Sequence, residues 1–361
     1  MPLRIAKKLI LLIVFMFALS AIVFWLARLA PHDPLYAYYG DAVERMSETQ
    51  RAAAMSRLNL DKPIAAQYFA WLGNALRGDF GISYKYKQAA LSVIGRLAPN
   101  TLLLGGISYI LTFALAILLG VWCAVREGGV ADRVIYRVGT ATSVIPSFFI
   151  ALIFILVFSV NLRLLPTSGA YSIGGGGFAD RAVHLILPVA VMTLSHLWYY
   201  AYMIRNRVVE ELRQDYVLLL RAKRLTTARV LRHCLRNMLP MLVTIMAVSV
   251  PHIIAGTYIV ELVFGYPGIG TLTFESARLR DYNMLSVLTL LTGFVILLSN
   301  MAAQSLSEVL DVRMRHTGAI NTLSAESVQS ATARSAALGA SNEQLTINNY
   351  GGLDGGRDDD A

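Results

Sequence analysis

The chain has 361 residues, of which 56% are apolar and only 15% carry a charge. A soluble domain of this length normally carries about 25% charged residues. The apolar residues gather instead into stretches of about 20 residues, the length that crosses a ~30 Å hydrocarbon core. This composition excludes a soluble globular protein and predicts an all-α polytopic membrane protein. The net charge of +9 comes from Lys and Arg beside those stretches, where cytoplasmic retention of positive charge explains it without a nucleic-acid ligand.

Six apolar stretches predict six transmembrane helices. The first, Leu9–Ala30, follows a basic N-terminus and is longer than the apolar region of a cleaved signal peptide, so we expect an uncleaved span. The other five spans are expected at Thr101–Val125, Val134–Val160, Leu185–Ile204, Leu239–Leu262 and Met284–Ala303. The charge bias of the short loops then places both termini in the cytoplasm.

The loops divide the chain into four parts. Residues 1–30 hold the N-terminal tail and the first span, and residues 31–99 form a long first extracytoplasmic loop. Loops beyond ~60 residues cross the membrane regardless of their charge, so the basic residues of this loop do not conflict with its position. Residues 100–316 form a core of five spans. Residues 317–361 are rich in Ser, Ala, Asn, Gly and Asp, a composition that predicts a disordered cytoplasmic tail.

A basic cytoplasmic loop, residues 205–238, lies between the fourth and fifth spans. It holds nine Lys and Arg and three acidic residues between Arg205 and Arg236. Helical spacing predicts two short amphipathic helices in it, one around Tyr216, Leu219, Leu220 and Lys223 and one around Val230, Leu231 and Leu235. Such a loop can lie passively at the membrane interface, or it can be a lever that a soluble partner moves.

Motifs for several chemistries are absent from the sequence. It has no phosphate-binding Gly-x-x-x-x-Gly-Lys-Ser/Thr loop, no nucleophile elbow and no His-Glu-x-x-His, which argues against a membrane-embedded enzyme. Cys123 and Cys234 fall in or beside spans and indicate no disulfide scaffold. Energy for uphill transport must therefore enter through another chain or an ion gradient. A stand-alone secondary carrier stays open as an alternative, although many such folds show internal repeats and none is evident here.

Several short motifs occur in a characteristic order. The outside loops contain Arg57-Leu-Asn-Leu-Asp-Lys-Pro-Ile64 with Gln67-Tyr68, then Gly78-Asp-Phe-Gly-Ile-Ser83, Arg96-Leu-Ala-Pro-Asn-Thr-Leu102, and Leu165-Pro166 with Gly169. The basic loop contains Tyr216-Val217, Arg221-Ala-Lys223 and Arg236-Asn237 with Pro240; further on stand Glu261, Phe264, Pro267-Gly268, Gly270 and Arg280-Asp-Tyr282. With these motifs the chain resembles, over about residues 1–316, the membrane-spanning permease subunits of ATP-binding cassette importers for dipeptides, oligopeptides and nickel.

The resemblance implies the type I importer permease fold and a non-catalytic subunit in the bacterial inner (cytoplasmic) membrane. The implied partners, besides membrane lipid, are a second homologous permease subunit forming a heterodimer, two ATP-binding subunits and an extracytoplasmic substrate-binding protein. No cofactor is expected on this chain, because ATP and Mg would bind to the partner subunits. Peptides are the expected substrate, and nickel or a metal–chelator complex is the alternative. The lack of a Cys/His cage favours an organic or chelated substrate over a bare ion.

The resemblance also implies two sets of site residues. The set for coupling to the ATPase subunit is Asp215, Tyr216, Val217, Leu219, Leu220, Arg221, Ala222, Lys223 and Arg224. The set for the translocation path or gate is Pro146, Ser249, His252, Glu261, Tyr266, Pro267 and Gly268. Pro146 is equally explained as a helix kink, and Phe264–Gly270 as a tight turn.

One departure from the family pattern concerns the end of the first amphipathic helix. The family has a glycine where this chain has Arg224. A glycine there would end the helix in a left-handed turn, a conformation that arginine adopts less readily. We therefore expect an altered coupling geometry at this point.

Overall fold

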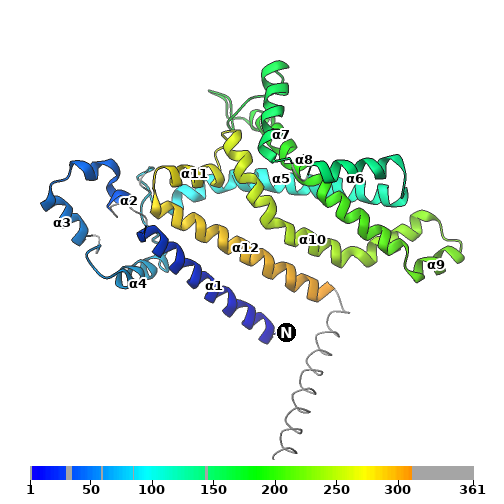
Figure 1. The fold of residues 1–361 in the computed structure, drawn as a ribbon, viewed down its shortest axis with the longest axis horizontal. Coiled ribbons are helices and arrows are strands. Elements are labelled where there is room, and N and C mark those ends of the chain that lie inside the picture. Colours follow the sequence, from blue (N-terminus) through cyan, green and yellow to red (C-terminus); the bar gives the residue numbers. More distant parts are fainter. Residues whose placement is uncertain (1, 30–34, 58–59, 84, 143–144, 311–361) are drawn as a thin grey trace, which may run out of the picture. The chain divides into compact units, whose positions relative to one another are not determined.

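The computed structural model describes residues 2–29, 35–57, 60–83, 85–142 and 145–310. These residues are all helical apart from turns and one antiparallel bridge between Ile82 and Ala89. Among them, five helices are long and apolar enough to cross a membrane (Figure 1): α1 (Pro2–Leu29), α5 (Ala90–Val125), α8 (Phe178–Leu212), α10 (Thr227–Val263) and α12 (Tyr282–Leu310). The expected tail, 317–361, lies outside the described residues.

The third expected span, Val134–Val160, is wrong as a single helix. Its sequence forms α6 (Val130–Thr142), then α7 (Ser147–Phe154), which continues into the π-helix η2 (Ile155–Asn161). Pro146 stands in an extended conformation directly before α7, because proline has no N–H for a preceding turn and its ring disfavours helical backbone in the residue before it. Pro146 therefore begins a helix and does not kink one. The apolar stretch Ser147–Asn161 is shorter than the other candidate spans.

The long loop between α1 and α5 is itself helical. It contains α2 (Tyr36–Tyr39), the 3₁₀ helix η1 (Gly40–Arg45), α3 (Glu48–Arg57) and α4 (Ile64–Ala75). In α4, Tyr68 is buried against α1: its hydroxyl lies 2.8 Å from Ser20 Oγ and its ring centroid lies 5.5 Å from that of Phe24. The loop therefore packs on the outer part of the first span.

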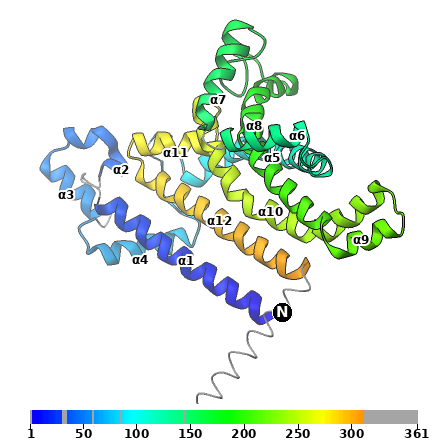
Figure 2. The same ribbon diagram turned by 45° about the vertical axis from the view of Figure 1, so that its right-hand side comes forward.

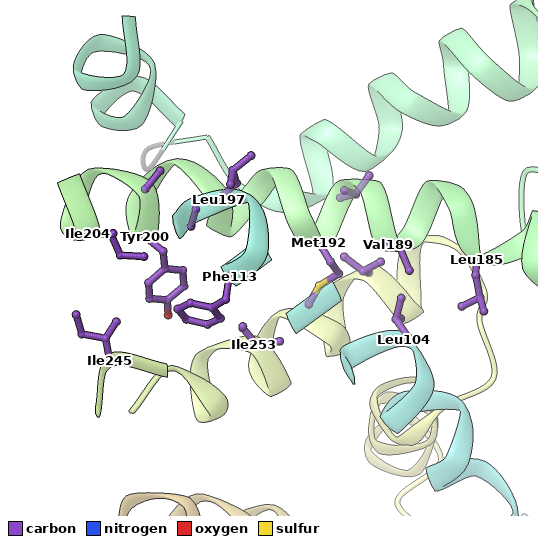
Figure 3. Close-up of a cluster of buried hydrophobic side chains, with 14 of the residues drawn as sticks. Leu104, Phe113, Leu185, Val189, Met192, Leu197, Tyr200, Ile204, Ile245 and Ile253 are labelled. Atoms are coloured by element: carbon purple, nitrogen blue, oxygen red, sulfur yellow. The ribbon is translucent and has the colours of Figure 1, made fainter. Parts of the chain in front are cut away.

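The main hydrophobic core lies between α5, α8 and α10 (Figure 3). Phe113 of α5 packs against Tyr200 of α8, with ring centroids 4.8 Å apart, and Ile253 of α10 belongs to the same cluster. A Cβ atom at Gly120 of α5 would lie 2.8 Å from the carbonyl oxygen of Ala201 in α8. Glycine thus lets the two backbones touch, and a larger residue at position 120 would push the helices apart.

The basic loop contains one separate amphipathic helix, not two. The first expected helix is α9 (Asp215–Ala222), but the residues of the second are the opening turns of α10. That helix continues through Pro240 and Pro251 to Val263, since neighbouring groups can compensate for the missing proline N–H inside a membrane helix. The amphipathic spacing around Val230 correctly predicts a helix. That helix is not short, however, because it continues into the fifth expected span.

Candidate functional site

Most of the residues expected to be functional lie near one or the other end of α10. Both ribbon views place α9 at the start of this helix and α11 (Ile269–Arg278) beyond its end (Figures 1 and 2). With 37 residues and a rise of 1.5 Å per residue, α10 separates the two places by roughly 50 Å. They are therefore two distinct sites.

The C-terminal end of α10, which the expected topology places on the outer side of the membrane, is closed by a tight reversal. Gly265 has a φ of 56°, the amide of Gly265 donates to the carbonyl of Leu262, and the amide of Tyr266 donates to the carbonyl of Glu261 over 2.8 Å. This is the Schellman arrangement, which needs a residue in the left-handed conformation and so favours glycine. It turns the chain sharply into the loop 264–270 and on into α11.

The side chain of Glu261 is fully buried beneath that loop, with 0% exposed. Its Oε1 accepts a hydrogen bond from Thr101 Oγ1 over 2.6 Å, and its Oε2 accepts one from the amide of Gly270 over 2.7 Å. The second contact puts the carboxylate at the N-terminus of α11, where free amides and the helix dipole stabilise negative charge. Glu261 therefore joins three helices.

Two glycines make room for this arrangement. A Cβ atom at Gly268 would lie 2.3 Å from the carboxyl carbon of Glu261, and a Cβ atom at Gly270 would lie 2.6 Å from Cα of Tyr258. Neither position has a positive φ. Space, and not backbone conformation, accounts for glycine at both.

Two side chains about three turns into α5, those of Asn100 and Thr101, hold the same loop. Asn100 Nδ2 donates to the carbonyl of Pro267 over 2.7 Å, while Arg181 of α8 donates to Asn100 Oδ1 over 2.7 Å. Thr101 Oγ1 accepts from the amide of Ile269 over 2.8 Å. We call Asn100, Thr101, Arg181, Glu261 and the loop 264–270 the outer clamp.

The outer clamp contains four of the expected gate residues and three that were missed. Glu261, Tyr266, Pro267 and Gly268 meet there, and the amide of Gly169, from another expected motif, donates to the carbonyl of Phe264. Asn100 and Thr101 belong to the motif Arg96–Leu102, which carried no assigned role. Arg181 belongs to no motif, so nothing in the sequence pointed to it.

The other expected path residues lie elsewhere. Ser249 and His252 are two to three turns earlier in α10; Ser249 is buried and donates to the carbonyl of Met246 over 2.6 Å, whereas His252 is exposed. Pro146 is exposed in front of α7. These three residues do not join the outer clamp.

At the other end of α10, α9 is anchored by one buried residue. Val217 is only 1% exposed and packs against Val230 and Cys234 of α10. Tyr216, at the edge of this cluster, donates from its hydroxyl to Glu211 Oε1. Burial, and after it this hydrogen bond, raises the pKa of Tyr216 above its usual value. Tyr216 and Val217 thus attach α9 to its own chain.

The opposite face of α9 is open. Leu218 is 72% exposed and Leu219 is 57% exposed, and they are accompanied by the exposed residues Asp215, Arg221, Ala222, Lys223 and Arg224. The structure therefore divides the expected docking set, because Val217 and Leu220 pack inward. Leu218, which the expected set does not include, is the most exposed leucine of the helix. The inward face follows i, i+3 spacing from Val217, which the sequence already showed.

Arg224 adopts the left-handed turn that a glycine would adopt. Its φ is 55°, its amide donates to the carbonyl of Arg221 over 2.8 Å, and the amide of Leu225 donates to the carbonyl of Leu220 over 3.3 Å. Leu220 and Leu225 also belong to one apolar cluster, as a Schellman end requires. The helix end expected of a glycine is kept, at a cost of about 1 kcal/mol in backbone strain.

A buried ion pair ties α8 to the turn after α5, close to α9. Asp132 of α6 accepts two hydrogen bonds of 2.7 Å from the guanidinium of Arg205, and one of 2.9 Å from the amide of Gly128. The Arg205 hydrogen bonds hold the pKa of Asp132 below its usual value. Nearby, the more exposed Arg213 donates to Glu127 over 2.8 Å. The inner ends of α5 and α8 are therefore fixed to each other.

Most of the chain is similar to known transport proteins. Residues 116–316 match the family described as binding-protein-dependent transport system inner membrane component, and residues 3–105 match its N-terminal family. The chain is 33% identical to the oligopeptide transport system permease protein AppB of Bacillus subtilis over 86% of this chain and 99% of that protein. It is 32% identical to the di/tripeptide transport system permease protein DppB of Pseudomonas aeruginosa, over 86% and 98%.

Two further matches are to a permease named for another substrate and to a transporter of solved structure. The metal-staphylopine import system permease protein CntB of Staphylococcus aureus is 30% identical, over 86% of this chain and 97% of that protein. A chain of the MetNI methionine ABC transporter, solved in inward-facing conformations, has a TM-score of 0.50 at 16% identity, and the match covers 61% of this chain and 97% of that one. The latter likeness shows the fold alone.

These matches and the all-helical membrane fold define a class, the inner-membrane permeases of ABC transporters. The chain belongs to the binding-protein-dependent transport permeases of the peptide and opine–metal importers. It is a multi-pass, non-catalytic membrane subunit, and its family implies ATPase and binding-protein partners.

Proposed function

We propose that this chain forms half of the path by which di- and oligopeptides enter the cell, in a heterodimer with a second homologous permease. Two ATP-binding subunits dock on α9 and drive the cycle by hydrolysing ATP with Mg, while an extracytoplasmic binding protein delivers the peptide. This chain itself binds no cofactor. The observation that carries the proposal is the open face of α9, with Leu218 and Leu219 exposed on a helix anchored to its own chain by Val217.

The open face has the properties of a docking surface for a protein. Exposed leucines on a short cytoplasmic helix gain nothing from water, and a soluble partner that covers them removes apolar area from solvent. Arg221, Lys223 and Arg224 beside them favour a partner with acidic groups. Since the sequence lacks a phosphate-binding loop, a nucleotide-hydrolysing subunit is the partner that this face fits.

The proposed topology keeps six spans and two cytoplasmic termini, in the type I importer arrangement. The third crossing is then made by the apolar segment Ser147–Asn161 together with neighbouring residues. Phe149, Leu152 and Leu156 of this segment are exposed on the single chain, which suits contact with lipid or with the second permease. The basic loop 205–238 lies in the cytoplasm in this topology.

Peptides are proposed as cargo because the relatives AppB and DppB carry peptide names and match nearly their whole length. A metal–chelator complex is the second candidate, favoured by the match to CntB. In the described part of the chain, no group of three or more His, Cys, Asp or Glu side chains is placed to hold a metal. The second candidate is therefore a chelate, recognised through its organic part.

The test is uptake by the complete transporter in proteoliposomes. Dipeptides, oligopeptides and nickel–chelator complexes are offered with the cognate binding protein, and ATP hydrolysis and accumulation are measured together. We expect peptides to stimulate both. Stimulation by the nickel–chelator complex alone would replace peptide by chelate as cargo, and ATP-independent uptake by this chain alone would show a secondary carrier.

A further inference from the structure

We propose that Asn100 and Thr101, about three turns into α5, are positioning residues that hold the loop 264–270 in its closed place, with Arg181 of α8 fixing the orientation of Asn100. The inference rests on the proposed function, because it treats that loop as the outer gate of a transport path. It assigns roles to three residues that lie outside the gate set expected from the family pattern.

Thr101 acts through both capacities of its hydroxyl. The group donates its single hydrogen to Glu261 Oε1 over 2.6 Å and accepts from the amide of Ile269 over 2.8 Å. A hydroxyl can do both at once, whereas valine of the same shape can do neither. Thr101 therefore connects α5 to the last turn of α10 and to the first turn of α11.

Asn100 depends on Arg181 for the direction of its amide. The guanidinium can only donate, so the end of the amide that faces Arg181 must be the oxygen. The NH₂ end is thereby directed at the carbonyl of Pro267, 2.7 Å away. Arg181 of α8 thus orients the Asn100 amide so that α5 presents an N–H donor to the loop.

The two helices that hold the loop are themselves joined along their length. Gly120 brings the α5 backbone against the carbonyl of Ala201 in α8. Asp132 of α6 accepts from Arg205 of α8 and from the amide of Gly128, so it links α8 to the turn after α5. α8 leads directly into the turn before α9. The pair of helices therefore gives the coupling helix and the outer loop one shared support, so a displacement of α9 that moves this support carries Asn100 and Thr101 with it.

The direct test is hydrogen–deuterium exchange in the complete transporter in lipid nanodiscs, following the amides of Ile269 and Gly270. Thr101→Ala removes the acceptor of one amide and a partner of Glu261, so exchange there rises about tenfold. Thr101→Ser keeps the hydroxyl and restores slow exchange. Thr289→Ala is the matched control, because its hydroxyl bonds only within α12, to the carbonyl of Leu285. Equal protection in wild type and Thr101→Ala would overturn the proposal.

A second variant tests Asn100 by function. Asn100→Asp keeps an acceptor for Arg181 but turns a carboxylate oxygen toward the carbonyl of Pro267, so the loop loosens while the helices stay paired. We expect ATP hydrolysed per substrate imported to rise about tenfold. Asn283→Asp is the control, since it loses a similar bond, to the carbonyl of Ile82, at an exposed position.

The outcomes separate this inference from the proposed function. ATP-dependent import by the wild type with an unchanged ratio in Asn100→Asp defeats the positioning role alone. Import by the wild type without ATP defeats the proposed function itself. The exchange of the Ile269 and Gly270 amides then still decides whether Thr101 holds the loop.

Discussion

The outer clamp and α9 lie at opposite ends of α10 and differ in what they bury. The clamp buries a polar side chain, and α9 leaves apolar side chains exposed. In the outer clamp, Glu261 is fully buried and both of its carboxylate oxygens accept hydrogen bonds from this chain. In α9, only Val217 is buried, and Leu218 and Leu219 stand in the open. The carboxylate of Glu261 is paired within this chain, although the Tyr266 hydroxyl and Arg181 Nε are buried without a hydrogen-bond partner among the described residues, whereas the exposed leucines of α9 suit a partner from another chain.

This difference shows where the two sites obtain their stability. A buried polar group that loses its partner is costly, so removing Glu261 or one of the groups that hydrogen-bond to it should destabilise the clamp. An exposed apolar face costs the isolated chain little and gains from a partner. Changes in the clamp should therefore affect folding and gating, and changes on the open face of α9 should affect assembly.

The largest effect is expected from Glu261→Ala. The substitution leaves the hydroxyl of Thr101 and the amide of Gly270 buried without their acceptor, which lowers the free energy of unfolding by about 3 kcal/mol. Thermal unfolding in detergent measures it. Glu261→Gln, which keeps one oxygen, should lose less than half as much, and Glu275→Ala, at a partly exposed ion pair with Lys85, should lose little. A small loss in Glu261→Ala would show that the clamp is not a closed unit.

The next effect separates the two faces of α9. Leu218→Asp should reduce co-purification of the ATP-binding subunits by about tenfold or more, because it places a charge in the apolar contact, and it should leave the unfolding temperature unchanged. Val217→Ala should do the reverse, with a loss of about 1–2 kcal/mol from its buried contacts. If both variants lowered stability alike, Leu218 would be packed within this chain itself and would not form a docking surface for a partner.

The basic residues beside that face sharpen the same distinction. The double variant Arg221→Glu, Lys223→Glu reverses charge at two exposed positions without touching the anchor. It should uncouple ATP hydrolysis from uptake while the protein stays in the membrane. Uptake and hydrolysis are measured together in membrane vesicles, and unchanged uptake would speak against α9 as the lever.

A smaller, pH-dependent effect is expected from the ion pair between Asp132 and Arg205, near α9. Since the pKa of Asp132 is lowered in the folded protein by Arg205, its stabilisation is fully present above the unfolded-state pKa of about 4. It is lost as the pH falls through the lower native value. Asp132→Asn should therefore destabilise the protein at pH 7 and show a smaller further loss towards pH 3 than the wild type. Glu127→Gln, at the more exposed neighbouring pair, serves as control.

The smallest effect is a gain. Arg224→Gly removes the strain of a positive φ at the end of α9 and should stabilise the helix end by about 1 kcal/mol or less, because glycine also gains freedom in the unfolded chain. Hydrogen exchange of the amide of Leu225 measures this. Faster exchange in the variant would mean that the arginine side chain itself holds the turn.

Apolar stretches predicted most of the fold because length and hydropathy suffice to define a spanning helix. They failed at Val134–Val160, where Pro146 stands between an amphipathic helix, α6, and a short apolar one, α7. They also failed at the end of the basic loop, since the amphipathic turns around Val230 run into a span without a stop signal.

The site residues also divide into those that could be expected from the sequence and those that could not. Gly268 and Glu261 were expected from the resemblance to the permease family, but Asn100, Thr101 and Arg181 act through contacts with residues far away in the sequence. No local pattern encodes a contact of that range. Leu218 could have been found from the sequence, because the inward face defined by Val217 and Leu220 leaves it outside.

The central claim is that this chain is moved by other subunits and does not transport alone. The most direct measurement compares uptake of a labelled peptide into proteoliposomes that hold this chain alone with uptake into those that hold the complete transporter, each with and without ATP. We predict accumulation only for the complete transporter with ATP and its binding protein. Accumulation by the chain alone, without nucleotide, would contradict the account.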